Sequence, residues 1–182
     1  MDKIITLHQN NLMKKILALT LLCMVAVSAI FAQHTAKENR VSPHETVKGK
    51  NVSVTYGRPY KKGRDIFGGL EAYGKVWRAG ADEATEITIA KPSAFAGHQL
   101  GAGTYTLFVI PNKDKWTIIL NRKLGQWGAF DYDKVKENDA LHVDVPVQPL
   151  DKALEQFTIT VGDEGFKMAW DQTSVFVPVK PY

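Results

Sequence analysis

Residues 157–170, FTITVGDEGFKMAW, decide the fold class. Apolar side chains alternate with polar ones on both sides of the short run GDEG at 162–165. A period of two is typical of a half-buried strand, and a glycine- and aspartate-containing run between two such strands is typical of a hairpin turn. The stretch therefore predicts two antiparallel strands joined by a tight turn.

The same alternation recurs along most of the chain. It is seen at residues 52–56, 87–89, 105–109, 116–120, 141–147, 157–161, 166–170 and 175–179. Turn-forming residues occur at 96–98, 111–115, 162–165 and 171–173, and no long segment has the period of a helix. About eight or nine short antiparallel strands need a second layer to cover their apolar face. We therefore predict an all-β fold, an antiparallel β-sandwich that is jelly-roll-like or immunoglobulin-like.

The N-terminal residues have the pattern of an export signal. Lys14 and Lys15 follow a second candidate start at Met13, and residues 16–30 form a 15-residue apolar run broken only by a threonine and a serine. A charged start followed by a short apolar run is typical of a cleavable signal, and this run is shorter than the roughly 20 residues that span a bilayer. We predict a signal peptide at 1–32, a flexible leader at 33–42 and a single domain at 43–182. The protein would then be periplasmic or secreted, with no membrane span after cleavage.

Removing that signal changes what the composition implies. The whole chain of 182 residues carries 23 Lys and Arg against 19 Asp and Glu, whereas residues 33–182 carry 20 against 18, a net charge of +2. The one cysteine, Cys23, is removed as well, which excludes disulfide scaffolds, thiol nucleophiles and cysteine zinc sites from the 150 residues that remain. A charge this small on an exported protein also argues against a nucleic-acid partner.

Residues 57–86 break the alternation. This segment, GRPYKKGRDIFGGLEAYGKVWRAGADEATE, has no clean period over 30 residues and holds six of the 14 glycines. Long irregular segments in compact domains are more often functional or packed loops than filler. We predict that this loop binds a small polar or anionic ligand or a cell-envelope partner. The candidate ligand-binding residues are Arg58, Tyr60, Lys62, Arg64, Trp77, Arg78, Glu83 and, outside the loop, Trp127.

These residue types suit an anion. Arg58, Arg64 and Arg78 would hold it through paired hydrogen bonds, since guanidinium groups match carboxylate and phosphate oxygens. Trp77 and Tyr60 would stack on the ligand, and Glu83 would orient one arginine. Trp127 lies between predicted strands, either as a rim platform for a sugar or peptide or as a buried plug.

The opposite interpretation is that the loop's own acids neutralise its arginines as internal struts. Asp65, Asp82, Glu83 and Glu86 lie in the same segment, and most charged clusters form paired or solvated networks. Convergence of the arginines and Glu83 on an open cleft would support a ligand site. Full pairing beneath the loop would support the struts.

Six motifs in order resemble a secreted bacterial family catalogued as domain of unknown function 2911. They are VSPHETV at 41–47, VTYGRPYKKGRDIFGGL at 54–70, YGKVWRAGADEATEI at 73–87, LGAGTYTLFVIP at 100–111, KWTIILN at 115–121 and QWGAFDYD at 126–133. The resemblance runs from about Val41 to Val179 and implies an exported Gram-negative protein, but it supplies no mechanism. Asp82 stands where the family's pattern commonly has asparagine, so an amide that can donate has become an acceptor-only carboxylate.

Two further classes of function stay open from the residues alone. An envelope hydrolase would use Glu83 or Asp82 with His44 as an acid–base pair, and a purely structural interaction domain would use neither. We favour binding over catalysis and predict no cofactor. We also predict no metal, because His34, His44, His98 and His142 are scattered and only His142 and Asp144 share the polar face of one predicted strand. The sequence does not indicate an oligomeric state.

Overall fold

A computed structural model describes Lys15 and residues 39–182 of the chain. The predicted signal peptide, apart from Lys15, and residues 33–38 of the predicted leader lie outside the described residues. Val41–Tyr182 form one compact unit, and the fold described below is that of this unit.

Nine strands form one antiparallel sheet in the order β1-β2-β3-β6-β7-β8-β9-β4-β5. Their bounds are β1 (His44–Lys48), β2 (Val52–Gly57), β3 (Glu86–Ile89), β4 (Ser93–Phe95), β5 (His98–Leu100), β6 (Gly103–Pro111), β7 (Lys115–Asn121), β8 (Asp139–Gly162) and β9 (Gly165–Pro181). The sheet is not closed into a barrel, because β1 and β5 remain at its two ends. The structure thus confirms the prediction of an all-β, antiparallel, sandwich-like fold.

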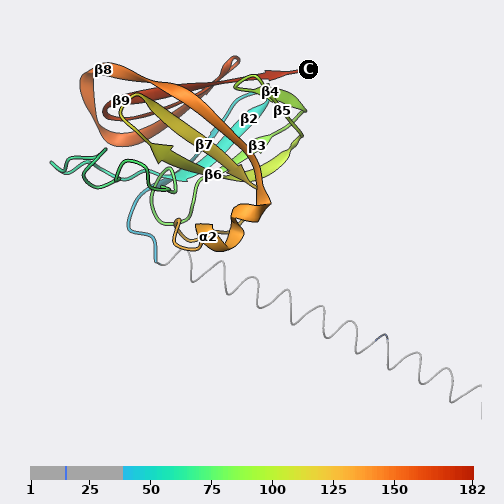
Figure 1. Ribbon diagram of the computed structural model, residues 1–182, viewed down its shortest axis with the longest axis horizontal. Coiled ribbons are helices and arrows are strands. Elements are labelled where there is room, and N and C mark those ends of the chain that lie inside the picture. The colour runs from blue at the N-terminus through green and yellow to red at the C-terminus, as the bar shows by residue number, and fades with distance from the viewer. Residues whose placement is uncertain (1–14, 16–38) are drawn as a thin grey trace, which may run out of the picture. The chain divides into compact units, whose positions relative to one another are not determined.

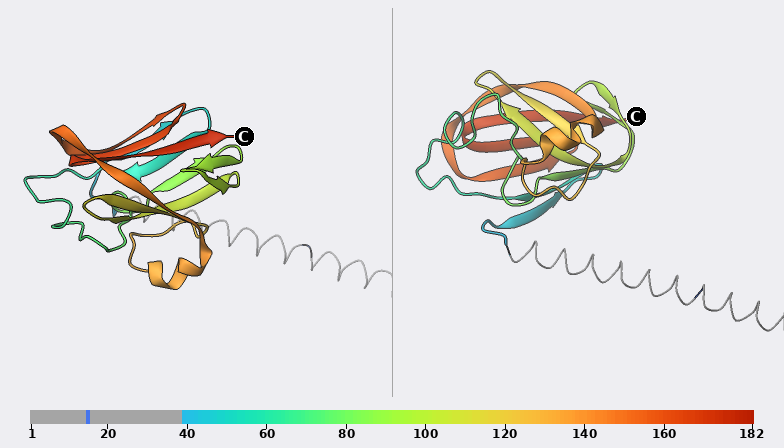
Figure 2. Two further views of the ribbon diagram at one scale, coloured as in Figure 1. Left: turned by 45° about the horizontal axis from the view of Figure 1, so that its top comes forward. Right: turned by 60° about the horizontal axis from the view of Figure 1, so that its bottom comes forward.

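The two layers of the sandwich are parts of one sheet that turns over along β8 and β9. The first part of β8 pairs with β7, at residues 139–146, and its remainder pairs with β9, at residues 147–162. Figure 1 shows these two strands as long curved ribbons, and Figure 2 shows the C-terminal strands lying over the layer that contains β6 and β7. The apolar side chains of β2, β3, β6 and β7 meet those of β8 and β9 in one core.

Alternation explains why these residues form strands. Val52, Val54 and Tyr56 of β2 are at most 3% exposed, whereas Thr55 between them is exposed. Three of the predicted turns are hairpin turns, because Phe95 pairs with His98, Pro111 with Trp116 and Gly162 with Gly165. A two-residue turn such as Asp163-Glu164 fixes the register of the strands that it joins.

The fourth predicted turn, at 171–173, is wrong. These residues lie inside β9, which runs unbroken through them, and Asp171 bends the strand with a left-handed φ of 52°. The register between β8 and β9 shifts opposite this bend, at Leu154. Residues 141–147 and 157–161, which the sequence indicates as separate strands, are likewise two parts of β8.

Within residues 39–182 the helical structure is one short segment between β7 and β8. It consists of α2 (Tyr132–Val135) and a 3-10 turn η1 (Lys136–Asn138). No helix in the described part of the chain is long and apolar enough to cross a membrane.

Candidate functional site

The 57–86 loop joins β2 to β3 and projects from one end of the sandwich, at the left of Figure 1. Its backbone pairs with the strands at isolated bridges between Tyr60 and Gln156 of β8 and between Trp77 and Val109 of β6. The amide of Trp77 donates to the Val109 carbonyl over 2.7 Å, and the Val109 amide donates back over 2.9 Å. These contacts fix the irregular segment on the sheet, as expected for a packed loop.

Trp77 is the main apolar anchor of the loop, which corrects its predicted role as a stacking platform. The side chain is only 3% exposed and its indole N–H donates to the Gly80 carbonyl over 3.2 Å. Its ring lies 5.9 Å from that of Trp116, 6.1 Å from that of Trp170 and 5.0 Å from that of Phe157, centroid to centroid. Trp77 therefore has no face for a ligand and belongs to the core.

Two glycines allow the loop to return close to β2. A Cβ atom on Gly57 would lie 2.2 Å from the carbonyl oxygen of Ala81, and one on Gly80 would lie 2.8 Å from the carbonyl oxygen of Gly57. Real side chains do not tolerate such approaches. The loop therefore needs glycine at both positions to place residues 80–82 beside the end of β2.

This close return forms a pocket of about 340 Å³. It is lined by residues of the loop, of the segment before β1 and of β9: Val41, Ser42, Pro59, Tyr60, Lys62, Arg64, Leu70, Glu71, Arg78, Gly80, Ala81, Asp82 and Trp170. Four of the predicted ligand-binding residues line it, namely Tyr60, Lys62, Arg64 and Arg78. Arg58, Trp77, Glu83 and Trp127 are not among its lining residues.

The two pocket arginines are held by backbone carbonyls. Arg64 donates from Nε to the Lys61 carbonyl over 2.9 Å and from Nη2 to the Tyr60 carbonyl over 2.5 Å. Arg78 donates from Nη1 to the Asp82 carbonyl over 2.9 Å and lies over the ring of Phe130, 5.2 Å from its centroid. Backbone carbonyls thus position both guanidinium groups, and among residues 39–182 neither group forms a salt bridge with a carboxylate.

Glu71 is a pocket residue that the sequence did not single out as a site candidate. Burial raises the pKa of its carboxyl group from the usual 4.5 to about 7, although the neighbouring charges of Arg78 and Arg64 act to lower the pKa. Perturbed acids in pockets often mark functional sites. The acid is one of several in the loop, and its burial arises from packing that no local pattern shows.

Arg58 is a strut rather than a pocket residue. Its Nη1 lies 3.0 Å from a carboxylate oxygen of Glu45 in β1, and Nη2 donates to the Thr158 hydroxyl over 3.2 Å. Nε donates to the Phe157 carbonyl over 3.4 Å. The cationic set therefore divides, with Arg58 tying β1 to β8 while Arg64 and Arg78 face the pocket.

The predicted acid–base residues lie together beside the pocket. His44 Nε2 is 3.1 Å from Asp82 Oδ2 and 3.4 Å from Glu83 Oε2. The Asp82 carboxylate, with its side chain 4% exposed, also accepts the amides of Val41 over 3.2 Å and Ser42 over 3.1 Å. Asp82 adopts a left-handed φ of 63°, which aspartate and asparagine tolerate better than most residues. Its main contacts hold residues 41–44, at and just before the start of β1, against the loop.

Trp127 remains at the surface. Its side chain is 42% exposed, and its backbone forms an isolated antiparallel bridge with Glu83. The structure therefore favours the rim position over the buried plug among the two interpretations of this tryptophan.

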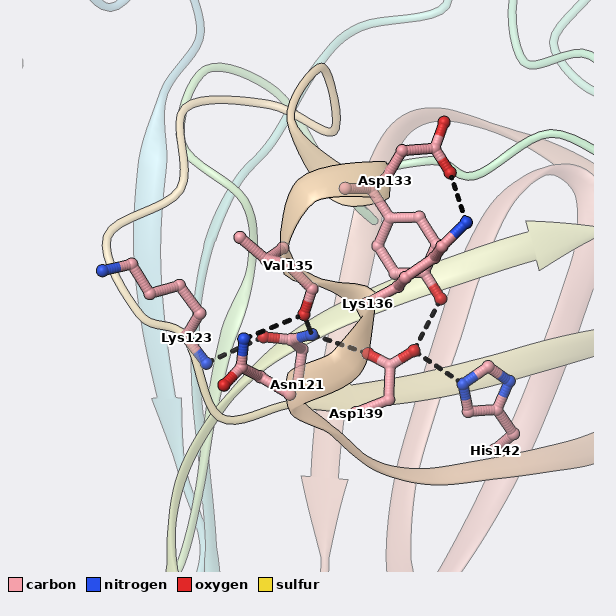
Figure 3. Close-up of polar contacts among 9 residues, drawn as sticks. Asn121, Lys123, Asp133, Val135, Lys136, Asp139 and His142 are labelled. Carbon is pink, nitrogen blue, oxygen red and sulfur yellow. Dashed lines mark hydrogen bonds and ion pairs between the residues drawn. The ribbon is translucent and has the colours of Figure 1, made fainter.

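A second polar cluster surrounds Asp139 at the start of β8 (Figure 3). Its carboxylate accepts hydrogen bonds from Asn121 over 2.6 Å and Tyr132 over 2.7 Å, and lies 2.8 Å from His142 Nε2. Burial and the Asp139 contact raise the pKa of the Tyr132 phenol. These contacts fasten α2 to the sheet.

The weak metal pair considered from the sequence is divided between two networks. His142 contacts Asp139, whereas Asp144 accepts hydrogen bonds from Lys115 and Thr117, each over 2.6 Å. The Lys115 and Thr117 contacts hold the pKa of the Asp144 carboxyl below its usual value. Among Lys15 and residues 39–182, no group of three or more His, Cys, Asp or Glu side chains is arranged to hold a metal ion.

Comparison with known proteins confirms the family resemblance. A family model described as a protein of unknown function (DUF2911) matches residues 38–179. No curated protein and no solved structure matches the chain significantly. The pocket and its side chains are therefore the features of the chain that indicate a function.

Proposed function

Because the chain belongs to the DUF2911 family, whose description assigns no activity, we propose from the geometry that it binds a small anionic ligand in the loop pocket. The cations that hold the ligand are Lys62, Arg64 and Arg78. The observation that carries the proposal is their position around one open pocket of about 340 Å³, a size that suits a small molecule.

The arginines retain hydrogen-bonding capacity for such a ligand. Within residues 39–182, the hydrogen bond of the Arg78 side chain uses Nη1, so Nε and Nη2 are available for the two oxygens of a carboxylate, phosphate or sulfate. Among the same residues, the hydrogen bonds of the Arg64 side chain use Nε and Nη2, so its Nη1 group can donate to a ligand. A guanidinium already oriented by carbonyl oxygens loses less conformational entropy when it binds.

The remaining pocket walls favour a ligand with an apolar part next to its charge. Tyr60 is 39% exposed and Leu70 is 44% exposed, and both line the pocket beside the cations. An organic acid or a phosphate ester would place its charged end at the arginines and its carbon skeleton on these side chains. The short apolar run at residues 16–30 supports the further proposal that binding takes place in the periplasm or the medium.

The test is a titration of the purified full chain with sulfate, inorganic phosphate and acetate, followed by calorimetry and by the midpoint of thermal unfolding. A bound anion raises the midpoint by mass action. We expect Arg78→Ala and Arg64→Ala to weaken binding at least tenfold. Arg122→Ala, which removes an exposed arginine outside the pocket, is the matched control and should bind as the wild type does. Equal binding by wild type and Arg78→Ala would disprove the proposal.

A second candidate function is hydrolysis, and it has one specific observation in its favour. His44 Nε2 lies 3.1 Å from Asp82 Oδ2 and 3.4 Å from Glu83 Oε2, so an imidazole and two carboxylates that could move a proton are close together. Its weakness is that neither His44 nor Glu83 lines the pocket. Chromogenic esters and glycosides test it directly, because turnover that survives in Glu83→Gln would remove Glu83 from the mechanism.

A further inference from the structure

We infer that the pocket takes up one proton at the Glu71 carboxyl group when an anion binds beside Arg64 and Arg78. This inference rests on the proposed function and specifies how the site responds to pH. It follows from the position of an acid among the cations that the ligand would use.

Glu71 is fixed in the pocket by its backbone. Its amide donates to the Ile66 carbonyl and its carbonyl accepts the Gly68 amide, both over 2.8 Å. The side chain of Ile66 is 1% exposed, so this turn is anchored in the core. The Glu71 carboxyl group therefore cannot leave the pocket by a simple movement of an exposed loop.

Glu71 shares the pocket with several other titratable and charged groups. The other titratable and charged groups that line the pocket all come from the 57–86 loop. They are Tyr60, Lys62, Arg64, Arg78 and Asp82. Arginine keeps its charge at any ordinary pH. The Asp82 carboxylate already accepts two backbone amides and contacts His44.

The Glu71 carboxyl differs from Asp82 in its contacts. Among the described residues no hydrogen bond to the Glu71 side chain occurs, and its favourable partners are the charges of Arg78 and Arg64. An anion that binds these arginines offsets their charge and places a second negative charge in the same pocket. Both effects favour the protonated carboxyl group, which can then donate a hydrogen bond to the anion.

The pKa of the empty pocket supports this coupling. Burial raises it to about 7 against the influence of both arginines, and loss of that influence on binding raises it further. Above this pKa the empty pocket holds more carboxylate, and the occupied pocket holds more of the carboxylic acid. Linkage requires the affinity for the anion to fall as pH rises, by a factor that approaches ten per pH unit.

The experiment is calorimetric titration of the full chain with sulfate, which stays doubly charged over the whole range from pH 5.5 to 8.5. At pH 7.5, titrations in buffers of different ionisation enthalpy give the number of protons taken up. We expect more than half a proton for the wild type and none for Glu71→Gln, whose affinity should not change between pH 6 and 8.5. Glu164→Gln, a change at a side chain 73% exposed outside the pocket, should behave as the wild type does.

Three results are decisive. Sulfate binding without proton uptake would overturn the inference and leave the proposed function intact, whereas no binding even at pH 5.5 would overturn both. Because imidazole also titrates near neutral pH, His44→Gln is the third variant. Uptake that persists in Glu71→Gln and disappears in His44→Gln would assign the proton to His44 and overturn the inference. The circular dichroism spectrum of each variant confirms that it is folded before titration.

Discussion

The sandwich and the 57–86 loop place tryptophans in the same core by different means. Trp116 of β7 is buried because strand alternation turns every second side chain inward, and its neighbours Ile118 and Leu120 follow the same rule. Trp77 is buried within an irregular segment, where single backbone bridges and close glycine contacts replace a continuous ladder. Regular strands thus supply the core, and the irregular loop uses that core to hold charged side chains at a pocket.

The largest expected effect compares Trp77 of the loop with Trp116 of β7, and asks whether both contribute equally to the free energy of unfolding. Trp77→Ala and Trp116→Ala should each lower the free energy of unfolding by about 3–5 kcal/mol, because both remove a fully packed aromatic side chain. Urea unfolding followed by circular dichroism measures the loss. Tyr182→Ala, at a side chain 73% exposed, is the control and should change it by less than about 0.5 kcal/mol. A loss below about 1 kcal/mol for Trp77→Ala alone would show that the loop is an appendage.

A glycine pair tests the close return of the loop. Gly57→Ala should destabilise the protein by about 1–3 kcal/mol or more, because its new methyl group would meet the Ala81 carbonyl oxygen at 2.2 Å. Gly162→Ala is the matched control, since nothing lies within 4 Å of a Cβ there. It should be neutral or slightly stabilising. Equal effects in urea unfolding would mean that the loop backbone shifts without cost and that the pocket is not fixed.

Substitutions of Asp82 test how residues 41–44 are held against the loop. Asp82→Asn should cost about 1–3 kcal/mol, because two amides and His44 surround the carboxylate and one amide of Val41 or Ser42 would then face an NH₂ group. Asp82→Ala should cost more, since it removes every acceptor and puts alanine at a left-handed φ. Asp163→Asn, at a side chain 71% exposed, is the control. A variant Asp82→Asn as stable as the wild type would show that an amide can replace the carboxylate at this position.

The regular part of the molecule was predictable because its signal is local. Each run of alternating residues contains its own evidence for a strand, and the three short turns contain theirs. The lengths of β8 and β9 were not predictable, because residues 148–155 do not alternate and are mostly exposed, and residues 171–173 are polar. Where a strand does not pack on the core, its sequence need not alternate between apolar and polar residues. A polar bend within a strand therefore has the same composition as a turn.

The site was predictable only as a composition. The loop's cationic residues indicated an anion site, and Lys62, Arg64 and Arg78 do line one pocket. Arg58 is chemically identical to the two arginines of the pocket, and its contacts with Glu45 of β1 and with Phe157 and Thr158 of β8 distinguish it. Glu71 becomes unusual through burial in a pocket that Ser42 and Trp170, residues far from it in the chain, also line. Contacts of this kind leave no trace in a single sequence.

The pH dependence of the free energy of unfolding tests Glu71 of the pocket separately from the sandwich. The Glu71 carboxyl loses its proton near pH 4.5 when unfolded and near 7 when folded, so the folded state binds more protons between these values. Its contribution of about 1–3 kcal/mol is fully present below pH 4.5 and is lost as pH rises through 7. Glu71→Gln should remove this part of the profile and exceed the wild type in stability at pH 8. Unfolding in urea at several pH values measures it, and Glu164→Gln should keep the wild-type slope.

The smallest expected effect distinguishes two arginines by their roles: Arg58, which ties β1 to β8, and Arg64, which lines the pocket. Arg58→Ala should lower the free energy of unfolding by about 1–2 kcal/mol, since it removes an ion pair and two hydrogen bonds at a side chain 25% exposed. Arg64→Ala should cost less than about 1 kcal/mol, because its hydrogen bonds are exposed and lie within its own loop. Sulfate calorimetry should give the reverse order, with binding lost in Arg64→Ala and kept in Arg58→Ala. If both variants lose stability equally and bind equally, the arginines form one structural network and the division between core-facing and pocket-facing charges is wrong.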